Sequence, residues 1–505
     1  MANWQIALFM MIGYLVIALA IGVMAGRGRG GDLTEYVVAG RGLGFVVTAF
    51  LMGGAVFSAF SFLGAPGWAY DRGAPAFYII TYTAFGILPW YLIGPKIGAI
   101  GRRFNLYTMS GFLHKRYGTK VLPMLVALIA LLAFIQYLAT QMKGMAYIFN
   151  IMTDGRVPFW LGALVAYGIV VLYVATGGLR AAAWSDVFQG GLMVIVSWAV
   201  GFAVVREVHG NSTSMFKEII ADNAGFLQIG SEGSTMSPVG YTTIILVSLI
   251  GILMWPHLFT KSYSSPAKVI KQTVLVYPLF ALFLVPLLLA GFAAIKAVQT
   301  GTVSPDEVLP YMITNVLDMP GWLYGLVGAG ALAAAMSSAD AMTHSAALEV
   351  TDGLVHKIKT DMTDQSTLRF IRIAVVVIGA GAYAVTIFGG QGLIALLLGA
   401  YGSIVQFAPG VYGALYWRRA TAPAVIAGLV SGALVNYYFQ FAAESTPLGI
   451  NAGIMGLMVN IVIFVAVTFM TPQSRVEEAD AYVDANAYDV DDSVVAIDES
   501  VAATD

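Results

Sequence analysis

The feature that most constrains this chain is a series of thirteen apolar stretches separated by shorter polar segments. Each stretch is close to the ~20 residues that an α-helix needs to cross a bilayer. Only 11% of the 505 residues are charged, against roughly 25% in ordinary soluble domains. A soluble chain of this length would need a much larger charged surface. The sequence therefore excludes a soluble globular protein.

The apolar stretches are expected to be membrane-spanning helices. Backbone groups in lipid must find partners within their own segment, and the stretches lack the alternation typical of barrel strands. The chain has no cysteine, which excludes disulfides and thiolate metal sites. The predicted fold class is an all-α integral membrane protein with thirteen transmembrane helices. We expect them at 4–25, 43–65, 75–94, 120–149, 158–177, 182–205, 239–262, 273–297, 321–348, 368–389, 392–416, 421–440 and 450–471.

The distribution of basic residues predicts the orientation of the chain. Cytoplasmic segments of membrane proteins carry an excess of Lys and Arg. With the C-terminus in the cytoplasm, twenty basic residues, Lys261 among them, fall inside and five fall outside. Lys143 stays within a span. The bias predicts a multi-pass protein of the cell membrane whose N-terminus lies outside and whose C-terminus lies in the cytoplasm.

Several spans carry helix-breaking residues near their middle. The second span contains Gly53-Gly54 and the seventh contains Gly251 and Trp255-Pro256-His257, while Ala408-Pro409-Gly410 interrupts the eleventh. Unwound backbone frees carbonyl oxygens, and secondary transporters bind their ion and solute at such breaks. The alternative is that Gly and Pro are simply frequent in membrane helices.

The second and seventh spans lie five helices apart, so they cross the membrane in opposite directions. This offset predicts two inverted five-helix repeats. The polar end, which holds ten of the 28 acidic residues, is expected to be disordered. The predicted units are 1–42 (first helix and cytoplasmic loop), 43–205 (first repeat), 206–238 (outer loop), 239–416 (second repeat), 417–471 (two C-terminal helices) and 472–505 (acidic disordered cytoplasmic tail).

A run of small and polar residues occupies the middle of the ninth span. Ser337 and Ser338 are followed by Asp340. One interpretation is a packing seam, because small residues let helices approach closely. The other is that the two hydroxyls face the broken second span and complete a neutral oxygen cage. Hard cations prefer oxygen ligands, and a neutral cage suits a monovalent ion.

Charged groups within the spans cost at least ~2.5–3.5 kcal/mol each on insertion scales. Asp186 lies near the inner end of the sixth span, where it could bind a cation, pair with Arg180 or cap the helix start. Lys143 could recognise an anionic solute or extend to the outer surface. His257 and His344 are interpreted as hydrogen-bonded packing residues rather than metal ligands.

The chain resembles the sodium:solute symporter family, which includes proline, pantothenate, monocarboxylate and sugar carriers. The resemblance rests on residues 177–189 and recurs at 39–44, 62–70, 255–257 and 335–340, so it extends over roughly 4–471 in family order. It implies a LeuT-like core of two inverted five-helix repeats, preceded by one helix and followed by two.

The resemblance also implies positions for the ions and the solute. The family sodium site would use main-chain oxygens of Gly54, Phe57 and Ala334 with the hydroxyls of Ser337 and Ser338. Arg41, Ser58 and Asp186 match positions tied to sodium coupling, and Asp340 is added as a candidate for coupling or a second cation. Proline carriers have a buried Asp where this chain has Val56, and aromatic residues where it has Ser248 and Ile252. These departures count against proline, whereas Trp255-Pro256-His257 and the 62–78 stretch look closer to the pantothenate and monocarboxylate branch. The predicted substrate residues are Lys143, Gln141, Trp255 and Ser248.

These observations favour sodium-driven uptake of a small organic solute, with a carboxylate expected. The partners would be Na⁺, the solute and the lipid bilayer, with no nucleic acid. A membrane sensor on the same core would usually carry a signalling domain after it. A membrane-embedded enzyme would need a dense catalytic cluster, which five scattered histidines do not supply.

Overall fold

The computed structural model describes residues 2–27, 31–54, 57–299, 301–317 and 319–486, and all regular elements in these ranges are helices. Val56 and the acidic end from 487 onward lie outside the described residues. The α-helices are α1 (Asn3–Gly26), α2 (Leu33–Val38), α3 (Phe45–Gly53), α4 (Ala65–Arg72), α5 (Tyr78–Phe85), α6 (Trp90–Arg103), α7 (Met109–Tyr117), α8 (Val121–Met152), α9 (Phe159–His209), α10 (Ser212–Asn223), α11 (Pro238–Leu253), α12 (Pro256–Tyr263), α13 (Ala267–Phe280), α14 (Leu284–Ala297), α15 (Val308–Asn315), α16 (Gly321–Val350), α17 (His356–Ile358), α18 (Asp364–Phe388), α19 (Leu393–Ile404), α20 (Ala408–Tyr416), α21 (Ala422–Tyr437), α22 (Ala452–Met470) and α23 (Val476–Val483).

Polar side chains fix where several of these helices begin. Asp32, Thr108, Ser237 and Thr363 each accept a hydrogen bond from a backbone N–H in the first turn of the helix that follows. Such caps satisfy backbone donors that have no partner within the helix. Because these residues stand between apolar runs, each apolar run becomes a separate helix.

The number of membrane spans is lower by direct count than the sequence predicts. Within the described residues, ten helices, counted across short irregularities, are long and apolar enough to cross a membrane, or up to twelve if each of two bent pairs is one span. One of the bent pairs joins Ala74–Phe85 to Trp90–Arg103 at 48° and covers the third predicted span. The count of thirteen is not confirmed by this criterion.

One helix accounts for part of the difference. α9 has 51 residues, about 77 Å at the rise of an α-helix and far longer than a ~30 Å hydrocarbon core. At Gly178 the backbone leaves the helical region, with φ 57° and ψ −145°. A Cβ at this position would lie 2.3 Å from the carbonyl oxygen of Tyr36. Only glycine fits there, and the break separates the two predicted spans 158–177 and 182–205.

The predicted helix breaks are present. α3 ends at Gly53, and the chain resumes helical structure in a π-helical turn, Phe60–Gly64, before α4. α11 ends at Leu253, Trp255 is extended, and α12 begins at Pro256. A single 3-10 turn, Val405–Phe407, separates α19 from α20. Three spans are thus interrupted where the sequence placed Gly and Pro.

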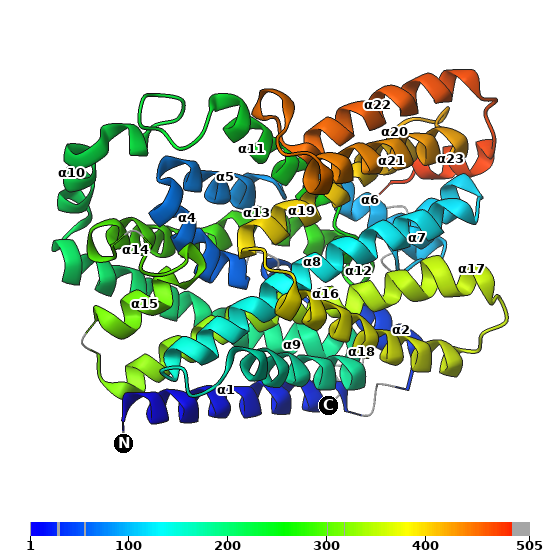
Figure 1. Ribbon diagram of the computed structural model, residues 1–505. Helices are drawn as coiled ribbons and strands as arrows, with labels where there is room; N and C mark the ends of the chain where they lie inside the picture. The colour runs from blue at the N-terminus through cyan, green and yellow to red at the C-terminus, as the bar shows by residue number, and fades with distance from the viewer. Residues whose placement is uncertain (1, 28–30, 55–56, 300, 318, 487–505) are drawn as a thin grey trace.

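α16 forms the centre of the fold. It packs against α1, α8, α9 and α18, and its residues from Val327 to Glu349 are all buried. Its many Ala, Gly and Ser residues explain this position, because small side chains allow neighbours to approach from every side. Figure 1 shows α1 and α22 at opposite edges of the molecule, with α8, α9 and α16 between them.

The expected disorder from residue 472 does not hold for the first part of that segment. α23 is helical and lies beside α7 and α20 (Figure 1). Its Tyr482 is fully buried and donates a hydrogen bond of 2.8 Å to the carbonyl oxygen of Phe112. Arg418 pairs with Asp480 at 2.7 Å and also with Asp484. Acidic composition had suggested a solvated tail, but one buried tyrosine and one arginine dock this helix.

Candidate functional site

The broken second span and α16 meet at a cluster of buried oxygen atoms. The hydroxyl of Ser338 lies 2.6 Å from the carbonyl oxygens of both Gly54 and Phe57. Gly54 and Phe57 lie after the end of α3 at Gly53 and before the π-helical turn, outside the assigned helices. Ala334 precedes Ser338 by one turn and is fully buried. The five residues assigned by resemblance thus lie on two adjoining segments. Gly54 and Phe57 follow α3, and Ala334, Ser337 and Ser338 belong to α16.

Ser337 connects this cluster to Asp186 on α9. Its hydroxyl donates a 2.5 Å hydrogen bond to Oδ1 of Asp186. Oδ2 of Asp186 is buried and has no hydrogen-bond partner among the described residues. A Cβ on Gly54 would lie 3.0 Å from Oδ2, so this free oxygen faces the helix break. Arg180, the alternative partner from the sequence, pairs with Glu35 at 3.0 Å instead.

A second buried carboxylate, Asp340, lies on α16 about one turn after Ser337. Oδ2 of Asp340 accepts a hydrogen bond of 2.9 Å from the hydroxyl of Tyr173. His344, on the same helix, contacts the carbonyl oxygen of Tyr36 at 3.0 Å. The packing interpretation of His344 agrees with this contact, and Asp340 faces α9 rather than the break.

Sequence reasoning missed a cation at this site. Lys261 was counted among the cytoplasmic basic residues, but it lies on α12 and is 1% exposed. Its Nζ donates a 2.6 Å hydrogen bond to the carbonyl oxygen of Leu51, at the end of α3. Its charge acts on both Asp186 and Asp340, although no ion pair within 4.0 Å joins them in the described part of the chain. The position of Lys261 just after the Pro256 break was the available signal.

Arg41 and Ser58 have local roles in the structure. The Arg41 guanidinium donates to Oδ1 of Asn105 at 3.0 Å and to the carbonyl oxygens of Leu106 and Tyr263. It therefore links its own segment to the segments at Asn105–Leu106 and at Tyr263, and no hydrogen bond joins it to the oxygen cluster among the described residues. Ser58 is buried, and its hydroxyl accepts from the backbone N–H of Ser61 at 3.1 Å, which fixes the start of the π-helical turn.

A small buried cavity lies beside the break between α11 and α12. Its volume is ≈10 Å³, about the space of one water. Of the predicted substrate residues, Trp255 lines this cavity and Ser248 does not. Tyr137 joins the cavity to the oxygen cluster, because its hydroxyl interacts with the hydroxyls of Ser58 and Ser338. The remaining lining residues are Ile252, His257, Leu258, Tyr277, Met342 and Tyr401.

His257 differs from its predicted packing role. It is 2% exposed, and neither ring nitrogen has a hydrogen-bond partner among the described residues. Its ring centroid lies 5.8 Å from that of Trp255. Buried polar groups normally find a partner, and an exception requires an explanation. An imidazole at the cavity wall with two unused nitrogens is available to a ligand.

Gln141 and Lys143 lie away from this cavity. Oε1 of Gln141 accepts a 2.8 Å hydrogen bond from the backbone N–H of Ala59, so it satisfies a donor released by the helix break. Nζ of Lys143 donates to the carbonyl oxygen of Gln391 at 2.6 Å. Asp306 is near Lys143, and burial raises the pKa of Asp306 against the opposing effect of that charge. The structure agrees with the interpretation that Lys143 extends toward the surface.

Comparisons with known proteins agree with these features. The chain is 28% identical to the Uncharacterized symporter YhjB of Bacillus subtilis (strain 168), over 94% of this chain and 99% of that protein. It is 28% identical to the Sodium/pantothenate symporter of Escherichia coli (strain K12), over 90% and 94%. The structure of a Na⁺-coupled sialic acid symporter superposes with a TM-score of 0.76 at 18% identity, over 93% of this chain and 99% of that one.

The sialic acid symporter supports the fold alone at this identity. A family model carries the relationship further, because it matches residues 36–432, which make up most of the chain and include all three interrupted spans. Membership also indicates that Na⁺ is used and that the chain is a multi-pass membrane protein. This chain belongs to the sodium:solute symporter family.

Proposed function

We propose that the oxygen cluster between the broken second span and α16 binds the co-transported Na⁺. The observation that supports this most strongly is the Ser338 hydroxyl, which lies 2.6 Å from the carbonyl oxygens of Gly54 and Phe57, just beyond the end of α3. When Na⁺ enters, this hydroxyl would rotate and offer a lone pair to the ion. The carbonyl oxygens of Gly54, Phe57 and Ala334 and the hydroxyl of Ser337 would complete a cage of neutral oxygens, which suits a monovalent cation.

A second cation is proposed at Asp186. Its Oδ2 faces the same helix break without a partner, so a cation there would be close to the first site. Lys261 and Asp340 complete the charge arrangement: two carboxylates and one ammonium leave one negative charge to be compensated. Ser58 and Arg41 would act on coupling indirectly, by fixing the break and the cytoplasmic segments.

Energetics favour a second cation for an anionic solute. One charge crossing ~100 mV is worth about 2.3 kcal/mol, and a tenfold gradient is worth about 1.4 kcal/mol. One Na⁺ with a monoanion moves no net charge and gains only the gradient term. A second cation restores the contribution of the membrane potential.

The solute is proposed to bind in the cavity at the α11–α12 break and to be a small carboxylate. His257 can donate an N–H to a carboxylate oxygen, and Trp255, Tyr277 and Tyr401 supply aromatic walls. The Sodium/pantothenate symporter and a Monocarboxylate transport permease protein of Rhizobium johnstonii, 26% identical over 92% of this chain and 97% of that protein, carry names of this chemical class. The closed cavity would widen as the flanking helices move.

Alternating access requires the complete topology. We propose thirteen spans, with α9 providing two and α3 to α4 providing one broken span, arranged as two inverted five-helix repeats. The N-terminus would lie outside and the C-terminus in the cytoplasm. Placing Lys261 inside the protein leaves the excess of cytoplasmic basic residues intact.

Reconstituted protein tests this function. Proteoliposomes would be given labelled monocarboxylates, amino acids and pantothenate under an inward Na⁺ gradient. We expect one carboxylate class to accumulate, and we expect accumulation to disappear when K⁺ replaces Na⁺ or an ionophore dissipates the gradient. Equal uptake in Na⁺ and K⁺ would contradict sodium coupling, whereas Na⁺-driven uptake of a non-carboxylate would contradict only the solute class.

A further inference from the structure

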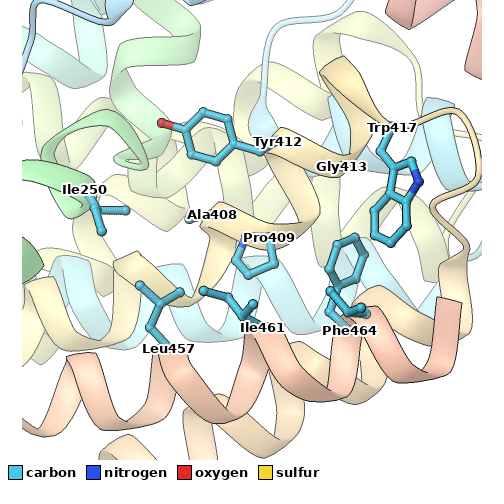
Figure 2. A pocket seen from close by; sticks show the side chains of 10 residues that line it. Ile250, Ala408, Pro409, Tyr412, Gly413, Trp417, Leu457, Ile461 and Phe464 are labelled. Atoms are coloured by element: carbon cyan, nitrogen blue, oxygen red, sulfur yellow. The ribbon is translucent and has the colours of Figure 1, made fainter.

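An apolar groove lies between α11, α20 and α22, away from the ion and solute sites. Figure 2 shows Pro409 of α20 opposite Leu457 and Ile461 of α22, with Trp417 and Phe464 together at one end. The groove has a volume of ≈440 Å³, and its length along α20 is about 13 Å at the helical rise per residue. Its lining is almost entirely carbon and is formed by Ile250, Ala408, Pro409, Tyr412, Gly413, Trp417, Leu457, Ile461, Phe464 and Val465.

The open side of the groove faces the lipid. Ile461 is 45% exposed and Val465 is 37% exposed, and both lie within the apolar span of α22. Lipid tails are as apolar as these side chains, so no hydrophobic force draws a tail inward. An empty groove would nevertheless leave its walls without van der Waals partners. In a bilayer, the available group of the right shape is an acyl chain.

A cationic side chain stands at the Trp417 end. The ring of Phe469 lies 5.9 Å from Trp417, and the guanidinium of Arg419 lies 5.7 Å above Phe469. Arg418 is paired with two carboxylates of α23. Arg419 has no ion pair in the portion of the chain that the structure covers, and its Nε is buried without a hydrogen-bond partner. An anionic group at this end would complement Arg419.

We propose that this groove binds one phospholipid, with an acyl chain along α20 and its phosphate at Arg419. The shape of the groove selects for a chain, and Arg419 selects for an anionic headgroup, because guanidinium groups match phosphate geometry. Trp417 suits the boundary between them, since tryptophan is enriched at the membrane interface. The groove shares no lining residue with the proposed solute cavity, although Ile250 and Ile252 of α11 line one each.

Native mass spectrometry of the purified full-length protein tests the proposal. Phosphatidylglycerol, phosphatidylcholine and inorganic phosphate would be titrated separately. Ile461→Trp fills the groove, and Val462→Trp places the same ring on the neighbouring residue, which is 67% exposed and does not line the groove. Arg419→Gln removes the charge, and Arg369→Gln removes an exposed charge on α18.

We expect one phosphatidylglycerol to bind the unaltered protein more tightly than phosphatidylcholine, with inorganic phosphate unable to displace it. Ile461→Trp should abolish this binding, and Arg419→Gln should weaken it about fivefold, the effect of one basic residue near an anionic lipid. The two control variants should bind like the unaltered protein. Equal binding by Ile461→Trp and Val462→Trp would overturn the proposal, as would displacement by phosphate. Loss of a dimer in Ile461→Trp would also overturn it and would assign the groove to a second copy.

Discussion

Two regions along α16, its middle and its C-terminal end, have buried carboxylates in contrasting states. Near the C-terminal end of α16, Glu349 accepts hydrogen bonds from the N–H groups of Met109 and Ser110 and from the Ser110 hydroxyl, at 2.5–3.1 Å. Beside the middle of α16, the Asp186 carboxylate accepts only from Ser337 among the described residues, and one of its oxygens has no partner there. A fully satisfied carboxylate fixes structure, whereas an unsatisfied one requires a ligand. The comparison separates residues that hold the helices together from those available to a cation.

A second acid, just beyond α16, adds contacts at this C-terminal end. Asp352 accepts from the hydroxyl of Thr108 and lies 3.6 Å from Nζ of Lys357. Both acids accept hydrogen bonds from the start of α7. α7 in turn accepts a hydrogen bond from Tyr482 of α23. The contacts at this end therefore satisfy both carboxylates, so substitutions there should lower stability rather than change Na⁺ binding.

Glu349→Ala should give the largest effect and should act on stability. It leaves two backbone N–H groups and one hydroxyl buried without partners, at about 1–3 kcal/mol for each. We expect a lower melting temperature in detergent and much less protein in the membrane, while the Na⁺ half-saturation of any surviving uptake stays the same. Glu349→Gln keeps one acceptor oxygen, so its melting temperature should lie between those of the unaltered protein and Glu349→Ala. A Glu349→Ala protein of normal stability would contradict the structural role of Glu349.

Asp186→Asn should produce the opposite pattern. The amide oxygen still accepts from Ser337, so we expect near-normal stability. Loss of the charge-assisted contact with a cation should weaken coupling by roughly 1.5–3 kcal/mol. Charge movement and solute flux recorded together in proteoliposomes should show one fewer charge per solute than in the unaltered protein. Unchanged charge per solute would make Asp186 structural, like Glu349.

His257 extends the contrast to the solute cavity, because it too is buried without a partner. His257→Phe keeps an aromatic ring of similar size and removes both nitrogens. We expect the solute half-saturation to rise about tenfold, within the 1–3 kcal/mol of a lost buried hydrogen-bond partner, with the Na⁺ half-saturation little changed. His257→Gln should recover part of the loss. If Phe and Gln variants transport alike, the ring nitrogens do not contact the solute.

Lys143→Met should have the smallest effect. Its ammonium group already has a carbonyl partner, Gln391, and it lies outside the solute cavity. We expect the solute half-saturation for a carboxylate to stay within about twofold, since such partly exposed contacts contribute little. A large rise confined to carboxylate solutes would restore Lys143 as the anion-binding residue and would count against His257.

The apolar helices and the positions of their breaks could be predicted from the sequence, because backbone N–H and C=O groups in lipid can be satisfied in only a few structures. The breaks at Gly53-Gly54 and Trp255-Pro256 appear as predicted. Lys261 was misplaced because charge counting assigns a residue to a side of the membrane and ignores its depth within a helix. The free nitrogens of His257 and the docking of Tyr482 depend on contacts between distant segments. Local sequence carries no record of those contacts.

The central claim is that the hydroxyl of Ser338 serves as a ligand to Na⁺. The most direct measurement is the Na⁺ dependence of solute uptake by Ser338→Ala in proteoliposomes. The control is Ser197→Ala, which removes an equally buried hydroxyl bonded only to its own helix, at the carbonyl oxygen of Val194. Loss of one ligand should cost about 1–3 kcal/mol, which raises the Na⁺ half-saturation roughly fivefold or more. The account predicts this rise in Ser338→Ala alone, and an unchanged Na⁺ half-saturation in a normally folded Ser338→Ala protein would contradict it.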